Sequence, residues 1–358
     1  MKRRSAWPTA WRWLVTLVHG ALVLIAAGST AMVLPADAHA DTGPDRVVVG
    51  AFINDLQDIN LAEDSYTVDM YLWMRWKNPN INPWQTIDVM NSNGTQNTTS
   101  SSTGGVVGEP LFENPKDMPD GSKYMIMRFQ GVFSRKMNLE KYPFDVQNLE
   151  LIFEDQGLDS RQLQFVPDTT PIRISRSVTN PGYRLEDPQM SIVNHLYRTN
   201  FGDLTAPPEV EYSRVIITMP VKREILPYLV KIMLPIFIVI IISWLIYALP
   251  ARLEDARTGI GITAMLTIVA LQWTTDDNLP SVEYLTMLDL IYILSMVFIL
   301  VAMAYTVYAS RRNLAAAAEA VTRSTDRKVS MITLGVYVFL VALTMILYLN
   351  HHHIDPPV

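Results

Sequence analysis

The pattern of apolar and polar positions changes character near residue 222. Before it, short runs of β-branched and aromatic residues, several of them alternating apolar with polar, are separated by turns rich in Asn, Gly and Pro. Alternation with a period of two is typical of half-buried strands, and regularly spaced short strands indicate a sandwich. We therefore predict an all-β sandwich domain over residues 41–222, with the polar stretch 91–105 as a surface loop.

Four long apolar stretches follow. Leu226–Ala248, Leu285–Tyr308 and Val329–Leu349 are long enough to cross a bilayer, which takes about 20 residues. Thr258–Trp273 is shorter and carries glycine, threonine and glutamine, which a lipid-facing helix would not favour. The pattern predicts an all-α transmembrane domain at 223–350, with four spans at about 226–248, 257–274, 285–308 and 329–349 and a short tail at 351–358.

Residues 1–40 have the pattern of an export signal. A basic Lys2–Arg4 start and an apolar stretch precede Ala38-His39-Ala40, which matches a cleavage site. The alternative is an uncleaved anchor helix. Basic residues between the third and fourth spans predict the cytoplasmic side, so the sandwich and the C-terminus would lie outside. They are Arg311, Arg312, Arg323, Arg327 and Lys328.

Composition narrows the function. Only 18% of the 358 residues are charged, against about 25% in soluble domains, in agreement with a membrane protein. The absence of cysteine excludes disulfides, cysteine zinc sites and thiol nucleophiles. A net charge of −6 argues against nucleic-acid binding. We find no metal-ligand spacing, nucleophile–base pair or phosphate loop, so we expect neither an enzyme nor a metal or other cofactor.

The polar second span places one set of residues on a single helical stripe. These residues are Asp255, Gly259, Thr263, Leu266, Ala270, Trp273 and Asp277. Several identical helices around a symmetry axis could enclose a pore with this stripe, and an apolar ring at Leu266 could then gate it by dewetting. The alternative is a helix whose small residues merely allow close packing within the bundle.

The segment Tyr142–Gln147, read as YPFDVQ, resembles the signature of pentameric ligand-gated ion channels, the Cys-loop receptor superfamily. Arg135 and Leu149 stand where animal members carry two cysteines, as in the cysteine-free bacterial branch. Ala256–Thr263 resembles the start of the family's pore helix, and Asn278-Leu279-Pro280 resembles the loop that follows it.

The resemblance implies a homopentamer in a bacterial inner membrane, surrounded by lipid and with the N-terminal domain and C-terminus periplasmic. A small-molecule agonist, an amine or a proton among the candidates, would bind between neighbouring sandwiches. The matching positions are Tyr197, Tyr212 and Glu154, with Trp76 or Arg75 on the complementary face. Tyrosine rings and a carboxylate suit a cationic amine. Packing on a strand surface is the alternative for both tyrosines.

Coupling of the agonist site to the pore is expected at the junction of the two domains. The residues that resemble its parts are Tyr142, Pro143, Phe144, Asp145, Arg223 and Pro280. Removing one partner of a desolvated Asp145–Arg223 pair would leave an unpaired charge, at a cost of about 3–5 kcal/mol. The alternative is an ion pair with a purely structural role.

Selectivity is the point on which the sequence conflicts with itself. Ala256-Arg257 and the GIGIT run resemble anion channels, whereas Glu254 and Asp255 would bring carboxylates to the inner mouth. Arg252 and Arg257 add an equal number of positive charges, so the residues that face the pore decide the sign, and the stripe turns Arg257 away from it. The outer domain is also acidic, with 24 acidic against 16 basic residues. We predict a channel for monovalent cations; an anion channel and a non-conducting sensor are the alternatives. Trp273 would form a second constriction or sit between helices.

Overall fold

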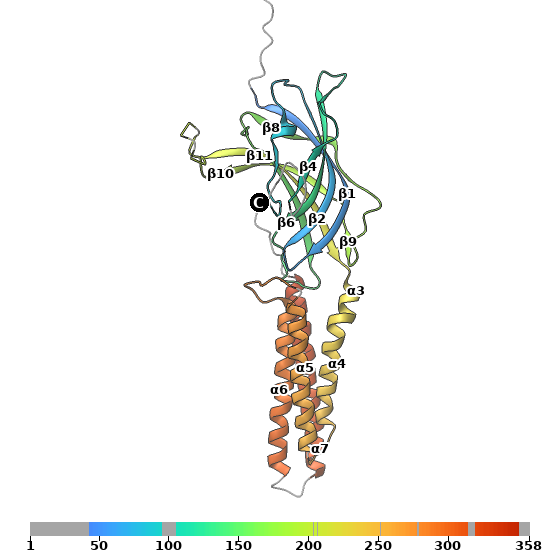
Figure 1. Ribbon diagram of the computed structural model, residues 1–358. Helices are drawn as coiled ribbons and strands as arrows, with labels where there is room; N and C mark the ends of the chain where they lie inside the picture. Colours follow the sequence, from blue (N-terminus) through green and yellow to red (C-terminus); the bar gives the residue numbers. More distant parts are fainter. Residues whose placement is uncertain are drawn as a thin grey trace, which may run out of the picture. The chain divides into compact units, whose positions relative to one another are not determined.

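The computed structural model describes residues 43–94, 105–202, 204–205, 207–250, 252–277, 279–313 and 319–350. The predicted signal peptide, the tail at 351–358 and most of the predicted loop 91–105 lie outside the described residues. Every strand and helix considered below belongs to one compact unit of the chain that begins at Asp45 (Figure 1).

The strands form two sheets, so the predicted sandwich is confirmed. The first sheet has the order β4-β6-β2-β1-β8, with β5 beside β6, and the second has the order β10-β11-β7-β3, with β9 beside β11. Among the described ladders β1 and β8 pair in parallel and the others antiparallel. The strands are β1 Asp45–Asn60, β2 Ser65–Trp76, β3 Ile87–Val89, β4 Val107–Pro110, β5 Lys116–Asp117, β6 Lys123–Ser134, β7 Val146–Asp155, β8 Leu163–Ile174, β9 Tyr183–Leu185, β10 Gln189–Tyr197 and β11 Val210–Arg223. A single helical turn, α2 Pro83–Thr86, precedes β3.

Strand β2 shows why the alternating pattern folds in this way. Its even-numbered residues from Tyr66 to Trp76 are at most 1% exposed and pack in the core between the two sheets. Its odd-numbered residues from Thr67 to Arg75 are only partly buried on the opposite face. Because successive side chains of a strand point to opposite faces, the parity of the apolar positions decides which residues enter the core.

Four long helical segments follow the sandwich. The first comprises α3 Ile225–Tyr228, a π-helical turn Leu229–Met233, α4 Leu234–Trp244 and a 3-10 turn Leu245–Tyr247. The others are α5 Glu254–Asp276, α6 Met287–Asn313 and α7 Glu319–Asn350. All four contain a stretch long and apolar enough to span a membrane, as the sequence predicts.

The helix ends differ from the predicted limits for local reasons. α5 begins at Glu254 rather than near 257, with two carboxylates in its first turn, where the helix dipole favours negative charge. α6 begins at Met287 rather than Leu285, because Thr286 and Asp289 exchange capping hydrogen bonds. The Asp289 amide donates to Thr286 Oγ1 over 3.1 Å, and the Thr286 amide donates to Asp289 Oδ2 over 2.8 Å.

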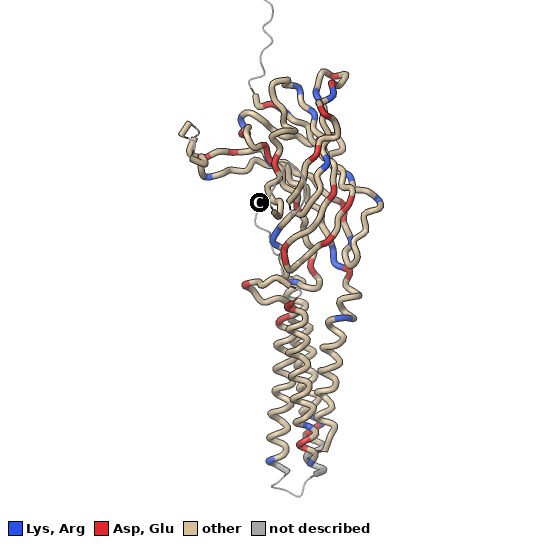
Figure 2. Tube along the Cα trace, viewed as in Figure 1, with Lys and Arg blue, Asp and Glu red and all other residues tan. Residues whose placement is uncertain are grey.

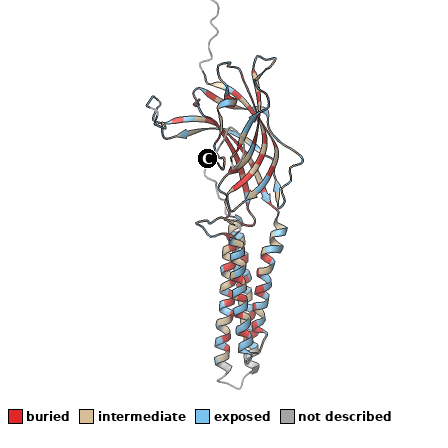
Figure 3. Ribbon diagram, in the orientation of Figure 1, coloured by how far each residue is buried: buried red, intermediate tan, exposed pale blue. Residues whose placement is uncertain are grey.

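Exposed positions run along α4, α6 and α7 (Figure 3), and many of them carry large apolar side chains. Ile241, Leu300 and Phe339, one on each helix, are 58%, 58% and 64% exposed. Acidic and basic residues of the helices gather toward the two ends, and the middle of the bundle is nearly free of them (Figure 2). Together with the four spans, this describes a multi-pass membrane protein.

Candidate functional site

Helix α5 exposes the whole stripe that the sequence singles out. Each of its members, from Asp255 through Thr263 and Ala270 to Asp277, is exposed in the protomer. Leu266 and Trp273 are 66% and 69% exposed. The opposite face of the helix is buried against the bundle and includes Arg257, Gly261, Ala264 and Ile268. α5 therefore presents acidic, small and hydroxyl residues outward, where its neighbours present apolar ones.

The two glycines of the GIGIT run, Gly259 and Gly261, have different surroundings. A Cβ added at Gly261 would lie 2.5 Å from Met303 Cγ, so the absence of a side chain lets α5 approach α6 closely. A Cβ added at Gly259 would meet nothing within 4 Å among the described residues. Close packing within the protomer thus accounts for Gly261 but not for Gly259, which lies on the exposed stripe.

Arg257 is completely buried and ion-paired, and it is absent from the exposed stripe, as predicted. Its Nη2 lies 2.8 Å from Asp326 Oδ2 on α7, and its Nε donates to the Leu249 carbonyl over 3.1 Å. Glu254 and Asp255 at the same end of α5 are exposed. Glu254 accepts a hydrogen bond from the Ser310 hydroxyl on α6. The exposed charge of the first turn of α5 is thus carboxylate, and the guanidinium is withdrawn from it.

Asp145 and Arg223 form the predicted pair where the sandwich meets the bundle. Arg223 Nε and Nη2 donate to Asp145 Oδ1 and Oδ2 over 2.9 and 3.0 Å, with side-chain exposures of 1% and 3%. Gln147 Nε2 also donates to Asp145 Oδ2 over 2.6 Å. A bidentate, desolvated pair of this kind is strong only while both partners are present.

Three tyrosine rings surround the Arg223 guanidinium. Tyr142, Tyr183 and Tyr228 have ring centroids 4.8 to 4.9 Å from its Cζ, and Nη1 donates to the Tyr228 hydroxyl over 2.9 Å. The rings come from the signature loop, from β9 and from α3, so cation–π contacts join three separate segments. Burial raises the pKa of Tyr183 to about 12, so the phenol remains neutral at physiological pH.

The signature loop itself packs into the membrane bundle. Tyr142 is buried in the hydrophobic cluster of the helices, and Phe144 packs against the same cluster. Pro143 between them is buried as well. The Leu139 amide donates to the Tyr284 hydroxyl over 2.9 Å, and the Met287 amide donates to the Glu140 carbonyl over 2.8 Å.

The loop after α5 meets this part of the sandwich. Pro280, Tyr284 and Leu139 line one cavity of about 420 Å³ between that loop and the sandwich. The residues predicted for coupling therefore lie together at the junction, within reach of α5 and α6.

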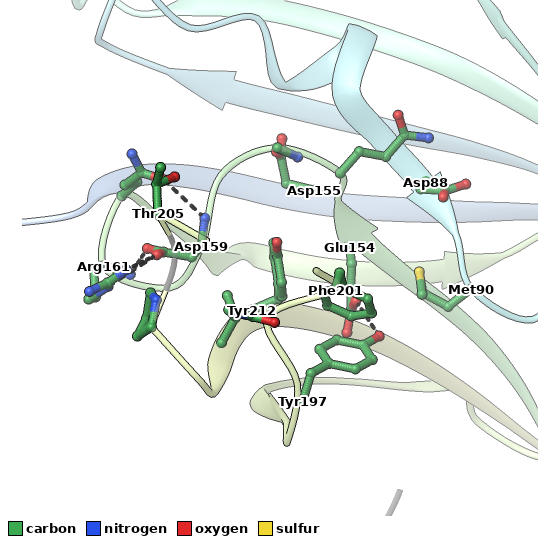
Figure 4. Close-up of a pocket in the computed structure, with 16 residues that line it drawn as sticks. Asp88, Met90, Glu154, Asp155, Asp159, Arg161, Tyr197, Phe201, Thr205 and Tyr212 are labelled. Carbon is green, nitrogen blue, oxygen red and sulfur yellow. Dashed lines mark hydrogen bonds and ion pairs between the residues drawn. The ribbon is translucent and has the colours of Figure 1, made fainter. Parts of the chain in front are cut away.

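An aromatic pocket lies at the opposite end of β7, where β10 and β11 extend away from the sandwich (Figures 1 and 4). Its volume is about 840 Å³. Tyr197 is one of its lining residues, and its ring centroid lies 5.8 Å from that of Tyr212 and 5.2 Å from that of Phe201, both edge to face. The structure thus brings Tyr197, Tyr212 and Glu154 together in one pocket.

Glu154 is present in the pocket but does not offer a free charge. Its side chain is 4% exposed, and Arg214 Nε donates to its Oε1 over 2.5 Å. The Tyr197 hydroxyl donates to its Oε2 over 2.9 Å. The expected charge complementarity between Glu154 and an amine is therefore corrected: Arg214 already neutralises this carboxylate, and Glu154 positions Tyr197. Burial, and next the bond to Glu154, raises the pKa of Tyr197.

The alternative between Trp76 and Arg75 is decided by burial. Trp76 is 1% exposed, lies in the sandwich core and donates its indole N–H to the Ile81 carbonyl over 3.0 Å, so it cannot reach a ligand and its assignment is corrected. Arg75 points to the outer face, with its side chain 39% exposed and 3.6 Å from Asp168. Arg75 belongs to the other sheet and does not line the aromatic pocket of its own protomer.

Several pocket residues escape the sequence reasoning. Phe201 supplies a third ring, and Asp159 and Arg161 of the lining form an ion pair. Arg214, which does not line the pocket, lies opposite Glu154 in the β7–β11 register. Phe201 carries a signal, because it adds a further aromatic residue four positions after Tyr197. The sequence around Arg214 gives no such signal, because its partner Glu154 is identified only by the pairing of β7 with β11.

Among the described residues no group of His, Asp and Glu is arranged to hold a metal ion. His195 lies beside Tyr197, with ring centroids 4.6 Å apart, and is not part of a ligand set. Burial, and next the charge of Arg214, lowers the pKa of His195 below its ordinary value.

Comparison with known proteins places these features in context. No family profile matches the chain. The chain is 28% identical over 203 residues to pH-sensitive chloride channel 2 of Drosophila melanogaster, which covers 54% of this chain and 38% of that protein. It is 23% identical over 283 residues to a glutamate-gated chloride channel of the same organism, covering 75% and 59%. It is 20% identical over 275 residues to gamma-aminobutyric acid receptor subunit gamma-4 of Gallus gallus, covering 73% and 57%.

The chain spans between about two fifths and three fifths of the length of these relatives. It is a distant homologue of ligand-gated chloride channels and of gamma-aminobutyric acid receptor subunits, and it lacks cysteine. These relatives are channels and receptor subunits rather than enzymes.

Proposed function

Starting from this distant homology, we propose that the chain assembles as a homopentamer and forms a ligand-gated ion channel. The single observation that carries the proposal is the exposed stripe of α5. An acidic, small and hydroxyl-bearing face directed outward from an otherwise apolar bundle needs contact with water, and a fivefold ring of such faces would supply it. In this account α4, α6 and α7 shield the α5 ring from lipid.

The pore would be lined by the seven stripe residues in the order of the helix. Leu266 supplies the apolar ring near the middle, a suitable constriction for gating by dewetting. Of the alternatives for Trp273, its 69% exposure in the protomer favours a second constriction over a place between helices of one subunit.

We assign the agonist site to the aromatic pocket with Tyr197, Tyr212 and Phe201 on one subunit, completed by Arg75 of a neighbour. Tyr197 packs edge to face against both other rings, and an aromatic surface of this kind suits a small cation or a flat organic ligand. Because Arg214 neutralises Glu154, attraction of an amine would depend on the rings and on the Asp residues at the rim.

Coupling between this site and the pore is assigned to the junction. β7 carries Glu154 near one end and follows the signature loop at the other, and β11 runs from the pocket to Arg223. A shift of either strand would act on the Asp145–Arg223 pair and on the loop that contacts Tyr284 and α6. An equilibrium between two states is decided by a few kcal/mol, so this pair is strong enough to bias it.

For selectivity we propose monovalent cations. Glu254 and Asp255 are exposed at the end of α5 together with one cation, Arg252, whereas Arg257 is buried against Asp326, so the net exposed charge at that mouth would be negative. A second candidate is an anion channel, favoured by the names of two relatives, which are chloride channels. A membrane-anchored sensor without conduction is the third.

We place the protein in a bacterial cell membrane, with the sandwich domain of residues 41–222 on the periplasmic side and the helical domain of residues 223–350 in the bilayer. The support is the concentration of arginine and lysine between α6 and α7, which is typical of cytoplasmic segments.

The test is a current recording from purified protein in liposomes, screened with amines, amino acids and pH steps in a sodium chloride gradient. The account predicts ligand-evoked current with a reversal potential that follows sodium. A reversal potential that follows chloride would select the anion channel. Ligand binding, measured by calorimetry, with no current under any condition would select the sensor.

Asp255→Asn is expected to reduce cation preference, because it removes the charge exposed on the stripe. Arg257→Gln is the matched variant: it changes a charge only two residues away, but on the buried face. It should leave the reversal potential unchanged while lowering thermal stability. An equal shift of reversal potential in both variants would contradict the assigned faces of α5.

A further inference from the structure

The loop between β6 and β7, residues 135–145, joins the two sheets of the sandwich at the end that meets the bundle. It carries the signature residues Tyr142 and Phe144, which pack in and against the hydrophobic cluster of the helices. No disulfide can close this loop, because the chain has no cysteine. Its position on the bundle must therefore be set by noncovalent contacts.

An ion pair spans the base of the loop. Arg135 is the first residue after β6, and its guanidinium pairs with the carboxylate of Glu150 on β7. The two side chains are 21% and 10% exposed. Because β6 belongs to the first sheet and β7 to the second, the pair connects the two sheets as well as the two ends of the loop.

Two uncharged side chains connect the sheets at the same level. The Tyr66 hydroxyl, from β2 of the first sheet, accepts a hydrogen bond from the Glu150 amide over 3.0 Å and donates to the Glu150 carbonyl. Asn91 Nδ2 donates to the Glu150 carbonyl over 2.6 Å and to the Ser134 carbonyl at the end of β6 over 3.1 Å. We refer to the two side chains and the ion pair together as the inter-sheet bridge, which consists of Tyr66, Asn91, Arg135 and Glu150.

The chain that follows the bridge is held on two sides. The Arg135 amide donates to the Asp64 carbonyl over 2.9 Å, and the Met137 amide donates to Asp64 Oδ1 over 3.0 Å. The Leu139 amide then donates to the Tyr284 hydroxyl in the loop after α5 over 2.9 Å. Leu139 follows Arg135 by only four positions, so at most about 15 Å of chain separates the bridge from this contact with the bundle.

Stability alone does not account for the bridge. Burying an ion pair removes the hydration of two charges, and replacing such a pair by apolar side chains of similar size is often neutral or stabilising. Leu149 and Leu151, on either side of Glu150, are completely buried in the sandwich core, so β7 already packs through apolar side chains. What directed hydrogen bonds and an ion pair add is a defined geometry.

We propose that the inter-sheet bridge positions the signature loop on the helical bundle, with Arg135 and Glu150 as positioning residues. The pair holds the ends of the loop at a fixed separation, and the bonds to Asp64 and Tyr284 carry this position to the loop after α5. Loosening the bridge frees the signature loop without unfolding the sandwich. The part of the bridge in coupling rests on the function proposed above, whereas the position of the loop is independent of conduction.

The test measures hydrogen–deuterium exchange of the detergent-solubilised full-length protein by mass spectrometry, without ligand. Arg135→Met with Glu150→Leu replaces the ion pair by apolar side chains of similar size, so the oligomer peak and the melting temperature should remain those of the wild type. The amides of residues 136–145 should exchange about tenfold faster, while the amides of β1 and β11 keep their rates.

Arg128→Met with Asp69→Leu is the matched control. This ion pair, with Arg128 Nη2 2.7 Å from Asp69 Oδ2, joins β6 to β2 within one sheet, so its loss should leave exchange at residues 136–145 unchanged. Glu150→Gln is a milder variant of the bridge, because it keeps the shape of the side chain and removes its charge. It should raise exchange at residues 136–145 about threefold.

Wild-type exchange at residues 136–145 in both bridge variants, or an equal rise in the control, overturns the proposal. A rise spread evenly over the sandwich shows a purely structural role and overturns it as well. The same holds for loss of the oligomer peak in the apolar variant together with wild-type exchange in Glu150→Gln. Absence of current from the wild-type protein would instead remove the proposed channel function, and the exchange rates would still decide the role of the bridge.

Discussion

Strand β2 and helix α5 each have one buried face and one exposed face. The two regions differ in the kind of side chain that their exposed surfaces carry. In the sandwich, the inward face of β2 is apolar, and its outward face carries Thr67, Asp69 and Arg75 together with two aromatic residues that have a polar group, as expected of a domain in water. In the bundle, α4, α6 and α7 turn apolar side chains outward, and α5 alone among the described spans turns acids and threonine outward.

The difference teaches that exposure in a protomer has to be interpreted by its surroundings. Exposed leucine and phenylalanine on α4, α6 and α7 fit lipid or a neighbouring subunit, whereas exposed aspartate and threonine at membrane depth fit water. The following predictions test whether the α5 face is a water-facing surface and whether the sandwich acts on it through the junction.

The largest effect is expected at the junction. Asp145→Ala should leave Arg223 buried and unpaired, and should cost about 3–5 kcal/mol of stability. We expect most of the protein to be lost from the oligomer peak in size-exclusion chromatography. The neutral double variant, Asp145→Asn with Arg223→Gln, should recover assembly, because it leaves no unpaired charge.

The neutral double variant distinguishes a role of the Asp145–Arg223 pair in coupling from a purely structural role. If the pair transmits the signal, the double variant should assemble but respond weakly to agonist. Full agonist response in that variant would show that the pair only holds the two domains together.

A smaller effect is expected from the two glycines of α5. Gly261→Ala places a methyl group against Met303 and should cost about 1–3 kcal/mol of stability. Gly259→Ala meets open space and should leave stability unchanged or raised by up to about 1 kcal/mol, since alanine favours helix. Thermal unfolding in detergent measures both; equal losses would mean that Gly259 also packs against protein.

Leu266→Ser should lower the barrier of the constriction by wetting it. We expect the half-maximal agonist concentration to fall about tenfold, together with a leak in the absence of agonist. Met265→Ser, on the neighbouring position and only partly exposed, is the matched control. Unchanged leak and sensitivity in Leu266→Ser would remove Leu266 as the gate.

The smallest effect concerns His195 and the pH dependence of stability. Burial lowers its folded-state pKa below the ordinary value of 6.5, so the unfolded chain binds a proton more readily than the folded chain. Stability should therefore decline as pH falls through 6.5. His195→Gln should flatten this decline in a series of melting curves, and a steeper decline in the variant would contradict the sign.

The features that could be predicted from the sequence are those that depend on the periodic spacing of apolar and polar residues. The parity of β2 and the i+3/i+4 spacing of α5 are local properties, so the sandwich, the spans and the exposed stripe follow from them. The same alternation, extended from Tyr66 to Met74, places Trp76 in the core, and the structure agrees with this pattern rather than with the complementary-face position that the resemblance implies.

Other features depend on the pairing of distant segments. Arg214 faces Glu154 only through the β7–β11 register, and Arg257 meets Asp326 across 69 positions of the chain. No local pattern reports such partners, because register and helix packing are properties of the folded chain. For this reason the aromatic residues of the pocket could be predicted from the sequence, whereas the pairing of Glu154 with Arg214 could not.

The central claim is that the exposed face of α5 lines a water-filled pore, and the absence of cysteine from the chain allows a direct measurement. Single cysteines are placed at Thr263 and Ala270 on the exposed stripe and at Ala264 and Ile268 on the buried face. A charged, water-soluble thiol reagent is then applied during agonist-evoked current. The account predicts rapid block at Thr263 and Ala270 and none at Ala264 and Ile268. Equal reactivity on both faces, or block confined to the buried face, would contradict it.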